Sequence, residues 1–452
     1  MHIYLRYLFL LLAGESLAQP YPPVHFGMTT TTRFATRIPK TAQLLTTAEP
    51  GQIRILVYGQ SISRQDWWLE VRSFLKQRYP KVTITMVNQA IGGFSSERLK
   101  QMVENDVMAF YPDLILLHDY GNQPDYEQII RSIRSRTTAE VAIQTDHVAV
   151  GQNDAWHDQH SSVWLPALCD TYGLALIDVR TAWKAYLAKH RLAASALLTD
   201  AVHLNGHGNY LMAEIVKRYF NTLPVTAMTT ELEPSAGVSI LKPGRDFTLR
   251  NHTLRLRVTG NRIDVRWKDS AAHPSAVTVT IDGQEPSASV GCFYHTRPAR
   301  EPEGSFPTHI GQLLTLRLAG QLQPEDWTLI LTDVDSLRQE VRFRLHGSRT
   351  GPDGSGSSDS LFTSGSGRVV IEPQYWFRRN NPGDFGQFNW LKPGDTLQWN
   401  VLSMCHDTII PAAGHMQTLV QGIVNGEHVL TLAGQALTDL REIRVYRPPL
   451  PE

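Results

Sequence analysis

Polar residues follow an apolar run early in the chain in a way that could position a nucleophile. The sequence GQSIS at 59–63 places the Ser61 hydroxyl at the turn between a predicted strand and a helix. Ser63 and Asp66 have the spacing of a capping box, which predicts a helix that begins directly after Ser63 and directs free N–H groups toward Ser61. A serine in this position is more often only a helix cap, so this motif alone leaves both interpretations open.

Asp200 and His203 form a second pair with chemical potential, just before the last helical pattern of this half of the chain. A separation of three residues within one turn lets the carboxylate reach Nδ1 of the imidazole. That contact fixes the tautomer and leaves Nε2 to act as a base. Taken alone, the pair is more often a surface aspartate with an unrelated histidine.

Two further strand ends carry groups suited to binding a negative charge. Gly92 and Gly93 follow the second predicted strand, where missing side chains let backbone N–H groups approach a ligand. Asn122 lies in HDYGN after the third strand, and its amide can donate to a developing oxyanion. Each signal is weak, but four of them at successive strand ends in one compatible order favour a serine hydrolase site.

In these four blocks the chain resembles the SGNH, or GDSL-type, hydrolases, over residues 52–223. The resemblance implies that Ser61 is the nucleophile, that His203 is the general base and then acid, and that Asp200 orients His203. It also implies an oxyanion hole made of the N–H groups of Ser61 and Gly93 and the side chain of Asn122. The implied fold is a flavodoxin-like three-layer α/β/α sandwich.

The chain departs from this family pattern at two positions and gives little support to other kinds of catalytic site. Gln60 stands where aspartate is usual, and Gln123 stands where aspartate normally follows the asparagine. No GxSxG motif is present, which argues against an α/β-hydrolase. We expect no metal and no cofactor. A metal site would use His203 with His207, or the cluster His147, Asp154, His157, Asp158 and His160, but such residues at loop-to-helix junctions are usually solvated caps.

Strands and helices alternate through this half of the chain, as expected for a parallel sheet covered on both faces. We place strands at 53–58, 82–88, 113–118, 141–145 and 174–178, and helices at about 66–79, 95–110, 125–135, 160–172 and 207–221. Parallel sheets carry their chemistry at the carboxyl ends of the strands. The hydrolase domain is predicted to span 52–228, after an N-terminal extension at 19–51.

Apolar and polar residues alternate after about residue 230, which predicts an all-β sandwich region at 229–452 of one or two modules. Separate strands are expected at 254–258, 263–267, 277–281, 329–331, 341–345, 369–371 and 397–401, and Asn425-Gly426 sits between apolar runs. The Gly- and Ser-rich segment 347–367 is expected to be a flexible loop. This region is expected to help recognise a polymer without supplying the nucleophile, base or oxyanion donors.

Composition and the N-terminus limit the possible functions. Forty-three basic and 43 acidic residues give no net charge, so a nucleic-acid partner is not expected. Arg6, an apolar run and Ser16-Leu17-Ala18 predict a signal peptide at 1–18 and export to the periplasm or outside the cell. That run is too short to span a bilayer, and no membrane insertion is expected.

An exported esterase joined to a β region resembles the carbohydrate esterases that remove acetyl groups from polysaccharides, so we expect an acetylated polysaccharide or oligosaccharide as substrate. Alternatives are a secreted lipase or short-chain carboxylesterase, and a glycan-binding protein without catalysis. Several aromatic residues are suited either to stacking on sugars or to a protein core: Trp67, Trp68, Tyr120, Trp267, Tyr375, Trp376 and Trp390.

Overall fold

The computed structural model describes residues 21–24, 37–46, 51–223, 237–270, 275–299, 313–377 and 391–451. The expected signal peptide at 1–18 and Trp390 lie outside these residues. Among the described helices, none combines the length and apolar character that crossing a membrane requires.

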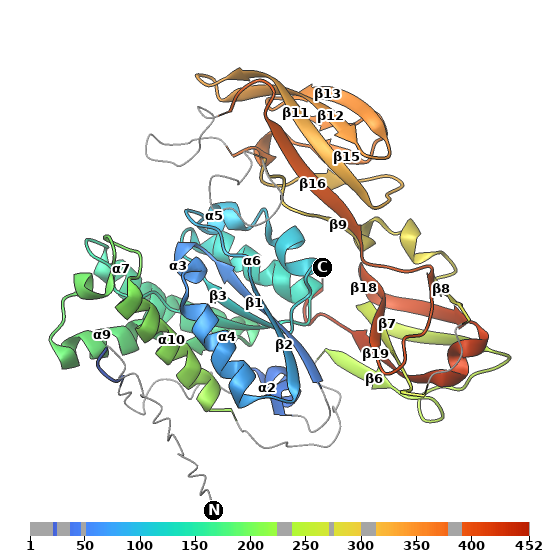
Figure 1. The fold of residues 1–452 in the computed structure, drawn as a ribbon, viewed down its shortest axis with the longest axis horizontal. Coiled ribbons are helices and arrows are strands. Elements are labelled where there is room, and N and C mark those ends of the chain that lie inside the picture. The colour runs from blue at the N-terminus through green and yellow to red at the C-terminus, as the bar shows by residue number, and fades with distance from the viewer. Residues whose placement is uncertain are drawn as a thin grey trace, which may run out of the picture.

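A five-stranded parallel sheet forms the centre of the first half of the chain (Figure 1). Its strands are β1 (Gly51–Gly59), β2 (Val82–Asn88), β3 (Leu114–His118), β4 (Glu140–Gln144) and β5 (Ala175–Ile177). Their order, β2-β1-β3-β4-β5, is that of flavodoxin-like folds and confirms the expected α/β class. Alternate residues of β1 enter two separate cores, because Ile55 and Val57 pack on one face of the sheet and Leu56 and Tyr58 on the other.

Helices cover both faces of this sheet. One core includes side chains of α2 (Pro39–Thr46), α4 (Trp67–Arg78), α9 (Val179–His190) and α10 (Gly206–Asn221). The other includes side chains of α5 (Ser96–Leu99), α6 (Gln123–Arg136) and α8 (Leu165–Tyr172). Helix α9 was not predicted, although its buried Val179, Trp183, Tyr186 and Leu187 follow helical spacing and Asp178 caps its start. The helix expected at 95–110 is instead α5 followed by a π-helical turn at Glu104–Met108.

The helix after β1 begins earlier than the capping box predicted. A short helix, α3 (Ser61–Arg64), starts at Ser61 itself, and α4 starts at Trp67. The reason is that the side chain of Gln60 accepts the Ile62 N–H and caps α3, while the Ser63 hydroxyl donates to the carbonyl of Tyr58. Asp66 precedes α4 but makes no side-chain capping hydrogen bond.

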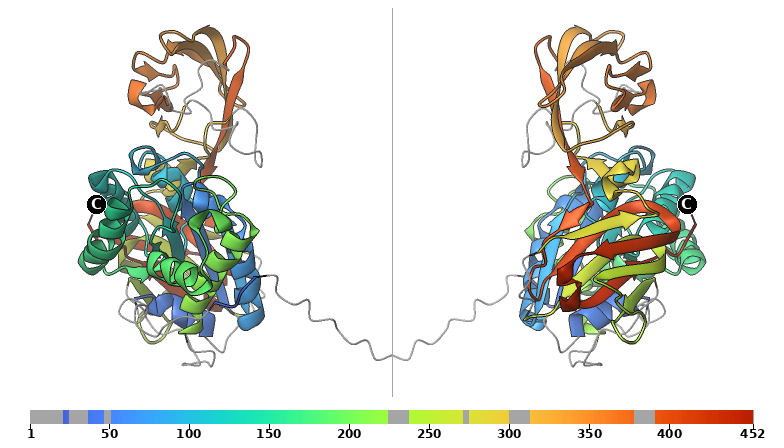
Figure 2. Two further views of the ribbon diagram at one scale, coloured as in Figure 1. Left: turned by 90° about the vertical axis from the view of Figure 1, so that its left-hand side faces the viewer. Right: turned by 90° about the vertical axis from the view of Figure 1, so that its right-hand side faces the viewer.

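Three antiparallel sheets make up the second half of the chain (Figure 2). The first has the order β17-β8-β18-β7-β19-β6, the second β13-β12-β11-β16-β9, and the third β10-β15-β14. Their side chains share one large core. The strands are β6 (Val238–Leu241), β7 (Thr253–Trp267), β8 (Val277–Ile281), β9 (Phe293–His295), β10 (Arg317–Leu318), β11 (Glu325–Asp335), β12 (Glu340–Gly347), β13 (Gly351–Ser357), β14 (Phe362–Thr363), β15 (Val369–Ile371), β16 (Thr396–Ser403), β17 (Thr408–Ile409), β18 (Met416–Ala433) and β19 (Leu440–Tyr446).

Two expectations for this region were wrong. The strands expected at 254–258 and 263–267 are one continuous strand, β7. Two strands were predicted because the pairing of β7 with β18 is irregular near Gly260, and this irregularity changes which residues face the core. Asn425-Gly426 lies inside β18 at that irregularity. The segment 347–367 is not a flexible loop, since it contains β13 and β14. One of its glycines is needed for packing, since a Cβ on Gly356 would lie 2.6 Å from the Phe362 ring.

Most of the aromatic residues considered as sugar platforms belong to the protein cores. Trp67 and Trp267 are fully buried, Trp376 is 3% exposed, and Tyr375 packs against the β core. Trp68 packs partly buried against the α/β core. Tyr120 is 38% exposed and stays available for contact with a ligand.

Candidate active site

Ser61, His203 and Asp200 lie in one hydrogen-bonded row. His203 Nε2 is 3.1 Å from Ser61 Oγ, and His203 Nδ1 is 2.8 Å from Asp200 Oδ2. The side chains of His203 and Asp200 are 44% and 57% exposed, so the row opens to solvent. This is the arrangement of a nucleophile, a base and a carboxylate that orients the base.

Ser61 owes its position to the close approach of β1 and β3. The last residue of β1, Gly59, pairs with His118 and has a φ of 128°. A Cβ on Gly59 would lie 1.8 Å from the His118 carbonyl oxygen, so only glycine fits there. The chain then turns into α3, which presents Ser61 at the carboxyl edge of the sheet.

A tight turn holds His203. Asp200 Oδ1 accepts the backbone N–H groups of Val202 and His203 at 2.7 and 2.8 Å, and Thr199 N–H donates to the His203 carbonyl. The hydrogen bond from the His203 backbone, together with those from the Val202 backbone and the imidazole, holds the pKa of Asp200 well below its usual value. The carboxylate therefore stays ionised and fixes the imidazole.

The Ser61 hydroxyl has a second neighbour besides His203. It donates to Gln60 Oε1 over 2.7 Å, and Gln60 Nε2 lies 3.1 Å from His118 Nδ1. His118 Nε2 is in turn 3.1 Å from Asp146 Oδ1, and the other oxygen of Asp146 is 2.5 Å from His157 Nδ1. Because the chain of contacts continues to Asp146, the Gln60 amide is held with its oxygen toward Ser61.

The expected oxyanion donors Gly93 and Asn122 follow β2 and β3, the two strands that flank β1. The loop before Gly93 is bound to β1, since Ile91 N–H donates to the Gly59 carbonyl over 2.9 Å. Asn122 Oδ1 accepts the Asp125 N–H and caps α6, which leaves the Nδ2 amide hydrogens for another acceptor. Their role as oxyanion donors remains a prediction.

Three of the residues considered for a metal site have other partners. His207 Nε2 is 2.7 Å from the Tyr186 hydroxyl, while Asp154 and Asp158 form ion pairs with Arg180. Within the described part of the chain, no group of three or more His, Cys, Asp or Glu side chains is arranged to hold a metal ion.

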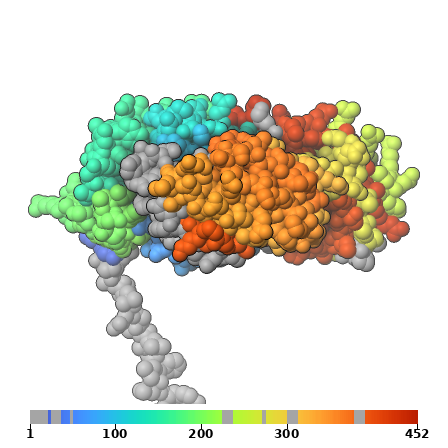
Figure 3. All heavy atoms as spheres, turned by 90° about the horizontal axis from the view of Figure 1, so that it is seen from above, coloured from blue at the N-terminus to red at the C-terminus, as the bar shows by residue number. Residues whose placement is uncertain are grey.

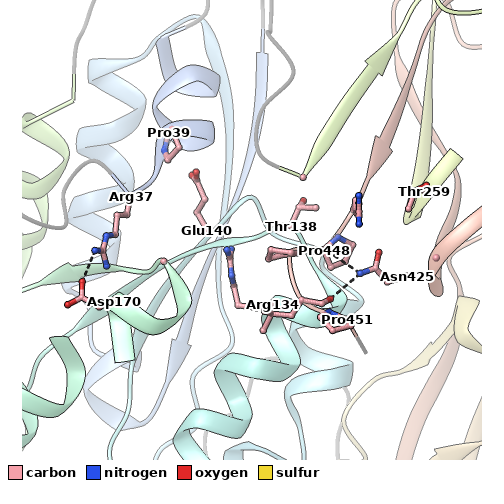
Figure 4. A pocket seen from close by; sticks show the side chains of 16 residues that line it. Arg37, Pro39, Arg134, Thr138, Glu140, Asp170, Thr259, Asn425, Pro448 and Pro451 are labelled. Carbon is pink, nitrogen blue, oxygen red and sulfur yellow. Dashed lines mark hydrogen bonds and ion pairs between the residues drawn. The ribbon is translucent and has the colours of Figure 1, made fainter. Parts of the chain in front are cut away.

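A cavity of about 800 Å³ lies at the amino-terminal edge of the parallel sheet, opposite the edge that carries Ser61 (Figure 4). It is lined by residues near the amino end of β4, including Thr138 and Glu140, and by the end of the chain around Pro448. Glu140 already accepts the backbone N–H groups of Lys40 and Thr41. The cavity is separate from Ser61, which stands at the carboxyl edge.

Comparison with known proteins gives no match to a protein-family model or to a curated protein sequence. Among solved structures, a two-domain esterase (CEX) active on acetylated mannans is 12% identical, with a TM-score of 0.36 over 93% of this chain and 96% of that protein. The acetylxylan esterase Axe2 from Geobacillus stearothermophilus is 19% identical, with a TM-score of 0.35 over 41% of this chain and 100% of its own. Likenesses of this degree do not define an activity.

Sequence patterns missed two side chains that position the site. Gln65 binds both backbone groups of Leu204, the residue after His203, and Asp146 anchors His118. Asp146 directly precedes His147, one of the residues considered for a metal, so its position after β4 was a usable signal. Gln65 carried no such signal, because its partner is 139 residues away.

Proposed function

We propose that this protein is a serine hydrolase of SGNH type that cleaves ester bonds through an acyl-enzyme intermediate. The observation that carries the proposal is the row from Ser61 Oγ to His203 Nε2 at 3.1 Å and from His203 Nδ1 to Asp200 at 2.8 Å. Ser61 follows the carboxyl end of β1, where flavodoxin-like folds place their chemistry, and Asp200 and His203 lie in the turn before α10.

In the first step His203 Nε2 takes the Ser61 proton as Oγ bonds to the ester carbonyl carbon. The hydroxyl hydrogen must leave Gln60 Oε1 for this transfer, since a single hydrogen cannot serve both acceptors. The negative charge that forms on the carbonyl oxygen is stabilised by N–H of Ser61, N–H of Gly93 and the amide of Asn122.

The intermediate collapses by breaking the bond to the alcohol oxygen, which takes the proton held on His203. Water then attacks the acyl-enzyme while His203 removes its proton, and the same oxyanion donors stabilise the second intermediate. Release of the acid returns the proton to Ser61 Oγ. All of these steps use side chains and backbone groups of this chain.

We further propose an exported enzyme whose substrates are O-acetylated polysaccharides. The exposure of His203 and Asp200 supports this class, because a site open to solvent accepts an acetyl group on a bulky polymer. The partly exposed Tyr120, next to the strand end that carries Asn122, can stack on a sugar ring.

The test is hydrolysis by the purified full chain of p-nitrophenyl acetate and longer p-nitrophenyl esters, then release of acetate from acetylated xylan, pectin and mannan. We expect a preference for acetyl over long acyl groups, and no activity in the folded Ser61→Ala variant. A preference for long chains would instead indicate a lipase. Binding to these glycans without hydrolysis would indicate a glycan-binding protein.

A further inference from the structure

The loop that carries Gly93 contacts the active site on one side and the β region on the other. We call residues 89–93 the oxyanion loop. On the active-site side, Gln89 N–H and Ile91 N–H donate to the carbonyls of Val57 and Gly59 in β1, each over 2.9 Å. These two bonds hold the N–H groups of Gln89 and Ile91, but not the carbonyl groups of Gln89 and Gly93 at the two ends of the loop.

Arg297, which follows β9, binds the first end of the oxyanion loop. Its Nη2 donates to the Gln89 carbonyl over 2.5 Å, and its Nε and Nη2 bind both oxygens of Asp106, each at 2.7 Å. Asp106 is 2% exposed and also accepts the hydroxyl hydrogen of Tyr58, three residues before Ser61. A two-point ion pair with a buried carboxylate holds a guanidinium in one orientation.

Phe377, which follows β15, acts on the second end of the loop through Arg98. The Arg98 guanidinium lies over the Phe377 ring, 4.3 Å from its centroid, and donates to the Gly93 carbonyl over 3.0 Å. Phe377 also packs against Phe94, with ring centroids 5.7 Å apart.

Apolar packing joins the same two parts of the chain. Tyr294, Leu314 and Phe377 of the β region belong to one buried cluster with Ile91 and Phe94. In Figure 1 the sheet β13-β12-β11-β16-β9 stands above α5, and Figure 3 shows orange atoms of the β region facing the viewer, with cyan atoms of the α/β half along one edge. The contact is therefore part of the protein interior.

We infer that the β region positions the oxyanion hole, with Arg297 and the pair Phe377–Arg98 orienting the Gly93 N–H from the two ends of the oxyanion loop. This rests on the proposed function. It goes beyond the expected role in polymer recognition, because the β region then affects hydrolysis of small esters as well. Arg297 and Phe377 are positioning residues and do not touch the substrate.

Loss of Arg297 is expected to reduce kcat rather than raise KM, because the Gly93 N–H matters most when charge develops on the carbonyl oxygen. We expect Arg297→Ala to lower kcat on p-nitrophenyl acetate by about tenfold to a hundredfold, since a small displacement of a catalytic group has effects of this size. Phe377→Leu keeps apolar burial while removing the platform under Arg98, and should lower kcat by about tenfold.

Arg297→Ala also leaves Asp106 buried without its partner, so a second variant is needed in case the first does not fold. The double variant Arg297→Gln with Asp106→Asn removes both charges and still releases the Gln89 carbonyl. Arg368→Ala is the matched control, because Arg368 similarly donates to a carbonyl, that of Gln321, and pairs with the buried Glu325, but lies in the β region away from the loop. We expect it to change the melting temperature and not kcat.

Coupling to Asn122 separates positioning of the oxyanion hole from general destabilisation. If Arg297 acts through the Gly93 N–H, its loss and Asn122→Ala affect the same oxyanion, and the double variant should lose at least about fivefold less than the product of the single effects. Product-like losses would mean that Arg297 acts elsewhere and would overturn the inference. The inference would also be overturned if the Arg297 and Phe377 variants folded and kept the wild-type kcat, while the Ser61→Ala variant was inactive. Absence of Ser61-dependent hydrolysis in the wild-type chain would overturn the proposed function and this inference with it.

Discussion

Gln65 uses both ends of its side-chain amide to bind the backbone of Leu204. Its Nε2 donates to the Leu204 carbonyl and its Oε1 accepts the Leu204 N–H, each over 2.8 Å. Gln65 directly follows α3, the helix that begins at Ser61, and Leu204 directly follows His203. The pair therefore ties the base to the nucleophile without involving Asp200.

Gln65→Ala should lower kcat by about tenfold to a hundredfold with a smaller change in KM, because His203 is then no longer held at bonding distance from Ser61. Steady-state kinetics on p-nitrophenyl acetate measure this. Gln417→Ala is the control: Gln417 also bridges backbone groups, those of Ile410 and Ala412, but in the β region. Equal losses in the two variants would show that Gln65 only stabilises the fold.

His203→Ala should reduce kcat by at least about a thousandfold, since the base is removed and the triad acts as a unit. Asp200→Asn should be less damaging, because the base remains and only its orientation and electrostatic support change. Circular dichroism establishes that both variants fold before their rates are compared. A more severe loss in Asp200→Asn than in His203→Ala would contradict the assigned roles.

Asn122→Ala should lower kcat by roughly a hundredfold with little effect on KM if its amide is an oxyanion donor. The substitution also removes the cap of α6, so Asn122→Asp is a useful companion: it keeps an oxygen for the Asp125 N–H but has no amide hydrogen. Both variants should lose kcat, while only Asn122→Ala should lose thermal stability. A raised KM at unchanged kcat would make Asn122 a substrate-binding residue.

Asp119, which directly follows β3, should make the stability of the protein depend on pH. It is 1% exposed, and burial, with the charges of Glu97 and Asp146, raises its pKa well above the usual value. Its contribution to stability is therefore greatest below its unfolded pKa and is lost as pH rises toward the folded pKa. Asp119→Asn has no carboxyl group to ionise, so it removes the loss of stability that ionising the buried Asp119 causes.

Asp119→Asn should accordingly be more stable than wild type at pH 7 in urea unfolding, and the difference should grow with pH by at most about 1.4 kcal/mol per unit. The half-buried Asp158 is a control of opposite sign, since hydrogen bonds from Lys184 and Arg180 lower its pKa. Asp158→Asn should lose a little stability above pH 4. Equal stability of Asp119→Asn and wild type at every pH would show that Asp119 ionises freely.

The local patterns of the sequence were enough to predict the α/β class, the five parallel strands and the residues of the hydrogen-bonded row. Strand ends are readable because apolar runs stop abruptly, and Asp200 reaches His203 within one turn of chain. The same local patterns were wrong about segment 347–367, because its glycine content was taken for flexibility. In the structure Gly356 lets β13 pack tightly against Phe343 and Phe362.

The tertiary structure alone decided which distant side chains support the site. Gln65 meets Leu204 across 139 residues, and Arg297 meets Gln89 across 208. Neither pair has a periodic or motif signal, because each contact exists only after the sheets have formed and packed. A sequence determines short-range geometry through backbone preferences and hydrophobic spacing, whereas contacts between separate elements depend on how complete surfaces fit together.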